Sequence, residues 1–364
     1  MSGNIETIKV SAEKLKRIAY KSFLYFGLNE EDALIASDVL SESDKKGIET
    51  HGLNRLKSYI NSIKNGKINK VAELKVIKDS GSTILFDGDY ALGLVSSTKA
   101  MKKAIERAKE TGICLVGIKN GGHFGTAGYY SLMAAKENMI GISMSNSDKI
   151  VVPYGGKKSI LGNSPWSIAF PGGNKYKDPV LVDMACSEVS FGRIQLAKRD
   201  NKEIPNTWGV DEEGNPTTDI DKIYKSQGLL PFGGAKGYAI TLVIEMLVLT
   251  LTGSGFGEKI GLSRSDDSRE NLGQVMIVID PNKMIGVEGF KEEVDGYIDY
   301  IKSVETLNGT SEIRIPGERT FEAERKNEEE GIDFSLKLAK ELLVFVKENN
   351  ILNNEATLED LFNM

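Results

Sequence analysis

The sequence is poor in the side chains that most often carry metal and thiol chemistry. Among 364 residues it has two cysteines, Cys114 and Cys186, and two histidines, His51 and His123. Two cysteines cannot build a disulfide framework for this length. No Cys/His spacing is typical of a metal site, so no metal is expected. Cys114 lies in an apolar run and is expected in the core, whereas Cys186 is expected in a polar turn.

Long apolar runs and an excess of basic charge are also missing. The first residues lack the apolar core of a signal peptide. The apolar stretch 239–251 is too short to span a bilayer and contains Glu245, so it predicts a buried helix. A net charge of −6 argues against nucleic-acid binding. We therefore expect a cytoplasmic protein without a nucleic-acid or membrane partner.

The common nucleotide and nucleophile motifs are absent. No GxGxxG follows an apolar run, and neither GxxxxGK[ST] nor GxSxG occurs. The nearest glycine pattern, residues 253–257, has the wrong spacing and follows a predicted helix, which it is expected to end. The sequence thus disfavours a Rossmann dehydrogenase, a P-loop enzyme and a serine hydrolase.

What is present is an alternation of apolar runs and helical patterns, which indicates an α/β or α+β sheet. Strands are expected at 82–87, 113–118, 140–145, 166–170, 180–183 and 273–280, and helices at 94–111, 129–137, 237–252 and 289–304. The beginning and end of the chain show only helical patterns. We expect a helical region over 1–75, joined by C-terminal helices in 318–364, and an α/β domain over 76–317.

A glycine-rich turn holds one histidine. His123 lies within Asn120–Tyr130, between a predicted strand and a predicted helix, with four glycines around it. Glycine lets the backbone approach a ligand closely, and histidine moves protons near neutral pH. A packed turn histidine is the alternative, but His51 also stands beside a glycine in a polar context. Both histidines are therefore candidates for a single active site.

The second histidine opens a segment with further polar groups. Thr50 is expected to cap a helix, on which Arg55 and Tyr59 share one face with His51 one turn before them. This predicts a proton carrier, a fixed cation and a phenol side by side; the alternative is a solvated surface helix. The run 145–147, Ser-Asn-Ser, either lines a pocket or caps a turn, and the pattern does not separate the two.

These segments together resemble the malate/L-lactate dehydrogenase family, which also holds sulfolactate, ureidoglycolate and diketogulonate enzymes and cyclic-imine reductases. The resemblance covers nearly the whole chain, in order. Its matching stretches are Thr50–Gly52 with Arg55 and Tyr59, His123–Gly125, Ser145–Ser147, Asn163–Pro165, Asp183–Ala185, Ile204-Pro205 with Trp208, Gly214–Asp219, Leu230–Tyr238 and Pro316–Glu318.

The resemblance implies a non-Rossmann α/β mixed sheet that binds NAD or NADP beside a helical N-terminal region, in a homodimer. The implied reaction is reversible hydride transfer between the cofactor and a small 2-hydroxy acid. L-malate is the first expectation, with lactate or ureidoglycolate next. The alternatives are a cyclic-imine or diketo-acid reductase, or a non-catalytic dinucleotide-binding protein.

The resemblance also implies roles for residues. Thr50, Arg55 and Tyr59 would bind the substrate, with Arg55 on its carboxylate. Either His51 or His123 would carry the proton; we favour His51, which leaves His123 to polarise the carbonyl or contact the nicotinamide. Cofactor contacts are expected from His123, Ser147, Asp183, Lys236, Gly237, Pro316, Gly317 and Glu318. Thr50 replaces the family's usual serine, and Cys186 a threonine-like position.

Overall fold

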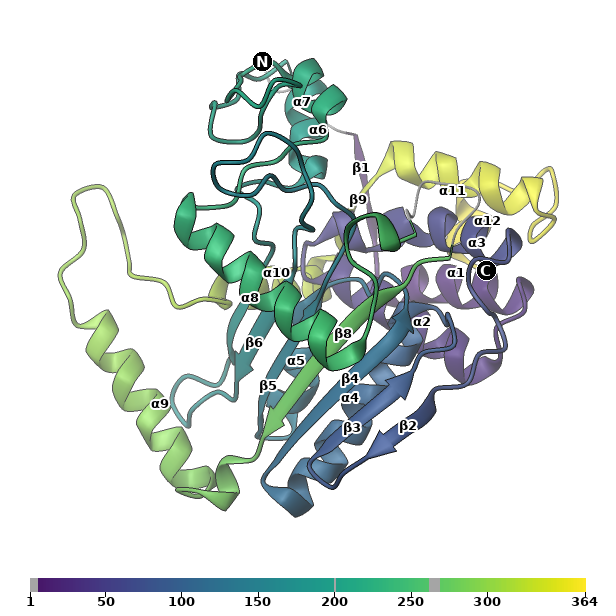
Figure 1. The fold of residues 1–364 in the computed structure, drawn as a ribbon. Coiled ribbons are helices and arrows are strands. Elements are labelled where there is room, and N and C mark those ends of the chain that lie inside the picture. Colours follow the sequence, from purple (N-terminus) through teal and green to yellow (C-terminus); the bar gives the residue numbers. More distant parts are fainter. Residues whose placement is uncertain (1–5, 200, 262–268) are drawn as a thin grey trace.

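The computed structural model describes residues 6–199, 201–261 and 269–364, and a seven-stranded sheet forms its centre (Figure 1). The strand order is β2 (Lys75–Asp79), β3 (Thr83–Asp87), β4 (Ile113–Gly121), β8 (Leu272–Ile279), β5 (Ile140–Ser145), β6 (Trp166–Phe170) and β7 (Val180–Met184). Among these neighbours, β3 and β4 run parallel and the other pairs antiparallel. The expected non-Rossmann mixed α/β sheet is confirmed.

Helices cover both faces of the sheet. Helices α4 (Gly93–Thr111) and α5 (Ala127–Lys136) lie on one face, where Met101 and Ala104 pack against Val116 and Met276. Helix α8 (Ala235–Thr252) crosses the other face (Figure 1). Helix α4 ends at Gly112 with a φ of 82°, a conformation that glycine adopts without strain, in agreement with the expected helix 94–111.

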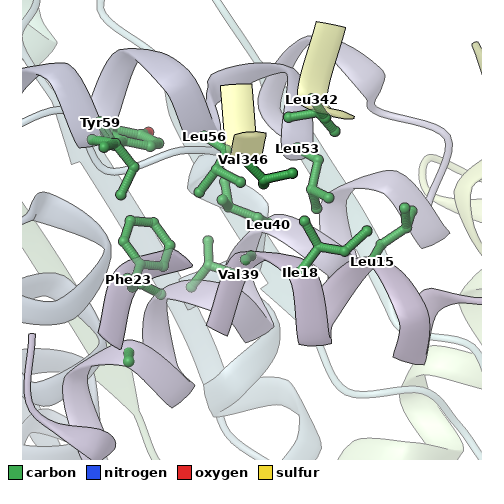
Figure 2. Close-up of a cluster of buried hydrophobic side chains, with 14 of the residues drawn as sticks. Leu15, Ile18, Phe23, Val39, Leu40, Leu53, Leu56, Tyr59, Leu342 and Val346 are labelled. Atoms are coloured by element: carbon green, nitrogen blue, oxygen red, sulfur yellow. The ribbon is translucent and has the colours of Figure 1, made fainter. Parts of the chain in front are cut away.

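Both ends of the chain build a separate helical layer. It contains α1 (Ala12–Tyr25), α2 (Glu30–Lys45), α3 (Leu56–Lys64), α11 (Leu336–Glu348), α12 (Leu358–Phe362) and the ladder of β1 (Thr7–Val10) with β9 (Ile332–Ser335). Figure 2 shows their shared core, in which Leu15 and Leu40 meet Leu342. Ser11 and Asn29 cap α1 and α2 by accepting bonds from backbone amides.

The remaining elements are connections. They are η1 (Glu49–His51), η2 (Leu53–Arg55), α6 (Phe191–Arg199), α7 (Ile220–Ser226), η3 (Gly257–Lys259), η4 (Pro281–Lys283), α9 (Val287–Lys302) and α10 (Glu318–Glu330). Residues 201–230 contribute Ile204, Ile223 and Leu229 to a small core of buried side chains.

Two expectations about burial are wrong. Helix α8 is not buried: its inner side chains Ile244 and Val248 pack on the sheet, but only a third of its residues are buried. Within the described residues it is the one helix long and apolar enough to cross a membrane by length and composition. Cys186 lies in a bend after β7, but the surroundings of its side chain are not polar as expected. It is fully buried and its thiol donates to the Ser164 carbonyl, whereas Cys114 is a core residue as expected.

Candidate active site

The segment from Thr50 to Tyr59 is not one regular helix, contrary to the sequence-based expectation. Thr50 lies inside η1 and caps nothing, and α3 starts only after Arg55. Gly52 breaks the segment with an extended ψ of −147°, and the amide of Leu53 donates to the Asp44 carboxylate at 2.8 Å. His51 and Arg55 therefore lie in two short 3-10 turns before α3 and not on one regular helix.

The Asp44 carboxyl holds this break in place by accepting the Leu53 amide. Asp44 is buried in α2, and burial raises the pKa of its carboxyl to about 8. A Cβ on Gly52 would lie 1.9 Å from Asp44 Oδ1, so a side chain cannot fit there. Sequence reasoning missed Asp44. Its spacing of four from the apolar Leu40 was the available signal, because that spacing places both on one face of α2.

Gly52→Ala is expected to damage the site without unfolding the protein. The added methyl group must push the Asp44 carboxylate or the 50–55 segment aside, at a cost of about 1–3 kcal/mol in stability. We expect kcat/KM to fall at least tenfold. Gly296→Ala is the control, since no atom lies within 4 Å of the place that its methyl group would take and the change favours α9. Equal kinetics in the two variants would contradict this account of Gly52.

The turn after β4 brings His123 to the same place. The His123 amide donates to the Glu270 carboxylate at 2.7 Å, and Gln274 of β8 donates to the Gly122 carbonyl at 3.1 Å. Gly93 packs so closely on the Gly122 carbonyl that no Cβ could stand there. Sequence reasoning missed Glu270 and Gln274, because neither pattern nor spacing distinguishes them from other strand and loop residues.

The structure unites the predicted proton carriers with their neighbours. The Tyr59 hydroxyl lies 2.6 Å from His123 Nδ1, and the two imidazole rings stack with centroids 5.9 Å apart. His51 Nδ1 lies 3.0 Å from the Thr50 hydroxyl. Arg55 Nε donates to the Thr50 carbonyl at 3.1 Å, which fixes the guanidinium beside the histidines. All five residues predicted as catalytic or substrate-binding therefore belong to one cluster.

The electrostatics of the cluster keep both histidines neutral. Burial, followed by the positive charge of Arg55, lowers the pKa of His51 to about 4. Burial, then the charge of Arg55 and then that of His51, hold the pKa of His123 well below its usual value. Burial raises the pKa of Tyr59 above its ordinary range, so its hydroxyl keeps the proton. The cluster thus offers proton acceptors next to a permanent cation.

A second region contains Ser147 and adjoins Lys236 and Gly237, three of the residues expected at a cofactor. Backbone bonds from Cys186 to Asn163 and from Phe232 to Cys186 bring three loops together. Ser147 belongs here, since its hydroxyl accepts from the Asn163 amide at 3.0 Å. Ser145 and Asn146 are buried and bond to Gly273 and Gly255 backbone groups, so in this run they are structural.

Asp183 lies between this region and the turn at Pro316. Its carboxyl is buried, with a pKa raised to about 6 by burial, and the Gly128 backbone lies against it. A cavity of about 70 Å³ opens beside both residues. Pro316 accepts from the Leu181 amide of the same strand, and Gly317 has a φ of 101°.

The other expected cofactor residues are placed as follows. Glu318 is bonded to the Ile315 amide and to Lys302. Lys236 is exposed in the first turn of α8, and Gly237 packs against the Phe232 carbonyl without room for a Cβ. Within residues 6–199, 201–261 and 269–364, no group of three or more His, Cys, Asp or Glu side chains is arranged to hold a metal ion.

Neutral imidazoles beside a fixed guanidinium, after the C-terminal end of β4, are groups that can accept a proton and bind an anion. The model of the malate/L-lactate dehydrogenase family matches residues 10–343, and the chain belongs to this family. It is therefore an oxidoreductase, a 2-hydroxyacid dehydrogenase that uses a nicotinamide cofactor.

Relatives and solved structures agree. The malate/(S)-sulfolactate dehydrogenase of Methanothermus fervidus is 39% identical over 342 residues, which cover 94% of this chain and 98% of that protein. The NAD(+) ureidoglycolate dehydrogenase of Escherichia coli is 33% identical over a region that covers 90% of this chain and 92% of that protein. The structure of sulfolactate dehydrogenase from Methanocaldococcus jannaschii superposes with a TM-score of 0.89, at 38% identity. The match covers 97% of this chain and 99% of that chain.

Proposed function

We propose that the protein transfers a hydride reversibly between NAD(P) and a small 2-hydroxy acid with a second acidic group, L-malate first and sulfolactate next. The observation that carries the proposal is the cluster of His51, Arg55, Tyr59 and His123 around one place. Relatives named for malate and sulfolactate support the substrate class.

Arg55 is proposed to bind the substrate carboxylate next to C2. Its Nε already donates to the Thr50 carbonyl, so the two terminal nitrogens remain to form a bidentate pair. Thr50 and Tyr59 complete the substrate contacts through their hydroxyl groups. A carboxylate at Arg55 would also offset the charge that depresses the pKa of both histidines.

The hydrogen bonds of the two imidazoles support different roles. His123 Nδ1 faces two donors, the protonated Tyr59 hydroxyl and, at 3.4 Å, the Gly125 amide. It therefore accepts there, and its Nε2 carries the proton and can donate to a carbonyl oxygen. His51 Nδ1 can donate to the Thr50 hydroxyl, which leaves its Nε2 free to accept the substrate's hydroxyl proton. We propose His51 as the proton carrier and His123 as the group that polarises the carbonyl.

The residues around Asp183 suit a nicotinamide dinucleotide, which would supply the hydride acceptor or donor. The Ser187 hydroxyl, two residues after the 183–185 run, is buried without a partner among the described residues. Gly128 lets the backbone approach the Asp183 carboxyl, where a Cβ would collide. We propose that Ser147, Asp183, Lys236, Gly237 and the turn 316–318 hold this cofactor, and that the helical layer and the α/β part are two domains.

A substrate panel tests the proposal. Purified protein is assayed with NADH and with NADPH against oxaloacetate, sulfopyruvate, pyruvate and Δ1-piperideine-2-carboxylate, by the loss of reduced-cofactor absorbance. We expect the highest kcat/KM for oxaloacetate or sulfopyruvate. Faster turnover of the cyclic imine would instead make the protein an imine reductase. Cofactor binding without turnover of any substrate would make it a binding protein.

We further propose that α8 joins two copies of this chain in a homodimer. Six apolar side chains of the helix face solvent: Ile240, Leu242, Val243, Met246, Leu247 and Leu251. An apolar patch of this kind on a helix already packed on its own sheet is typical of a subunit interface. The two reduced, buried cysteines fit the cytoplasmic location that we propose.

Val243→Glu is expected to convert the dimer to a monomer. Val243 is 57% exposed in the single chain, and a carboxylate there would lose its water at the interface. Sedimentation velocity at micromolar concentration should show half the mass of the unaltered protein. Val344→Glu on α11, at 51% exposure, is the matched control and should not change the mass. A Val243→Glu protein that sediments like the control would remove α8 from the interface.

A further inference from the structure

A lysine-lined cavity lies at the opposite end of α5 from the active site. Its volume is about 340 Å³, and its wall includes Lys136 of α5, Lys177 of the β6–β7 connection and Lys291 of α9. Helix α5 begins beside the histidine turn and ends at Lys136. The cavity is therefore displaced from His123 by roughly the 15 Å length of that helix.

The acidic groups around this cavity are already paired. Glu324, also in its wall, is bonded to Lys45 and Lys46 at 3.0 Å each. Asp178 accepts both of its bonds from Arg325. Asp295 accepts three backbone amides of residues 174–176. Glu324 therefore neutralises Lys46, which also lines the cavity, while Asp178 is engaged by Arg325 and Asp295 by backbone amides.

Of the four lysines in the wall, Lys136, Lys177 and Lys291 have almost no compensating charge. Among the described residues no ion pair involves Lys136 or Lys177, and Lys291 has only Glu288 at 4.0 Å, an exposed and weak contact. Three positively charged side chains from elements distant in sequence thus line one cavity. They repel one another when no anion is bound. A bound anion would offset this repulsion. Phe321 and Leu132 add an apolar side to the same wall.

From this geometry we propose that the cavity binds a small anion with two or more negative charges, at a site separate from the catalytic cluster. Its volume falls in the range of small-ligand pockets, which begins at about 300 Å³. The shared chemistry is a compact polyanion, either a phosphate compound or a polycarboxylate. Pyrophosphate and citrate are the probes that distinguish these two sources.

Isothermal titration calorimetry of the full-length protein tests the proposal at constant ionic strength. We expect one molecule of pyrophosphate or citrate per chain. Lys177→Ala combined with Lys291→Ala should weaken that binding about tenfold or more, because both residues line this cavity and neither lines the cavity beside Asp183. Lys337→Ala combined with Lys340→Ala, an equal charge change on α11, should change it less than twofold. Turnover without added anion should be the same in both double variants.

Three results would overturn the proposal. They are no binding of either probe at millimolar concentration, equal binding by both double variants, and competition in which the anion displaces NADPH but not NADH. The last would assign the cavity to the cofactor. If the alanine pair unfolds, Lys177→Glu alone replaces it: weaker binding than in a Lys340→Glu control supports the site, and unchanged binding refutes it. None of these readouts requires that the proposed substrate be correct.

Discussion

Replacing Arg55 by lysine should lower kcat/KM for L-malate by about 100-fold or more, with the fold intact. The guanidinium is held by its Nε bond to the Thr50 carbonyl and has two parallel donors left for a carboxylate. Lysine keeps the charge but loses the planar pair and the anchor, so the substrate would be held with less precise orientation. A misplaced carboxylate should lower kcat as well as raise KM.

The matched control for this change is Arg325→Lys. Arg325 also contacts both oxygens of a carboxylate, that of Asp178, but it is half exposed on α10. Steady-state kinetics and thermal unfolding of both variants separate the effect at the site from the loss of an arginine. If Arg55→Lys turns over at nearly the rate of the control, Arg55 does not bind the substrate carboxylate.

Replacing His51 by asparagine should reduce kcat for malate oxidation by about 1000-fold, within the range for a lost general base. Asparagine has no group that can accept the hydroxyl proton. His123→Asn should reduce kcat less, since the amide can still donate a hydrogen bond to the carbonyl oxygen. Both variants are compared with Tyr59→Phe, which removes the 2.6 Å hydrogen bond to His123 together with the proposed hydroxyl contact to the substrate.

The pH dependence distinguishes the two histidines. Because the pKa of His51 is lowered to about 4, the imidazole is unprotonated and able to accept a proton at every pH well above that value. We expect kcat/KM for oxidation to stay level from about pH 8 to about pH 6, past the ordinary histidine value near 6.5. It should decline only as the pH falls further towards 4. An acid limb that disappears in His123→Asn alone would exchange the two roles.

The sequence was informative wherever one side chain or one turn determines local structure. Glycine at 112 ends α4, and the apolar runs became the six expected strands of the sheet. The four-residue ladder of β1 with β9 was not predictable, because strands so short are defined by their partner and not by their own pattern.

For the site, residue type was a better guide than helical geometry. Two histidines and an arginine were enough to nominate the cluster, yet the single helix expected through them was wrong, because the chain breaks at Gly52, where the buried Asp44 carboxyl accepts the Leu53 amide. Glu270 reaches His123 across 147 positions of the chain, a contact that no local pattern encodes. Composition likewise could not show that α8 covers the sheet with only one side.

A crystal structure with NAD(+) and tartronate, a 2-hydroxy acid that resembles malate, tests the central claim most directly. We predict one tartronate carboxylate in a bidentate pair with Arg55, and its hydroxyl within hydrogen-bond distance of His51 Nε2 beside the nicotinamide. Tartronate bound away from Arg55, or a nicotinamide ring remote from both histidines, would contradict the account.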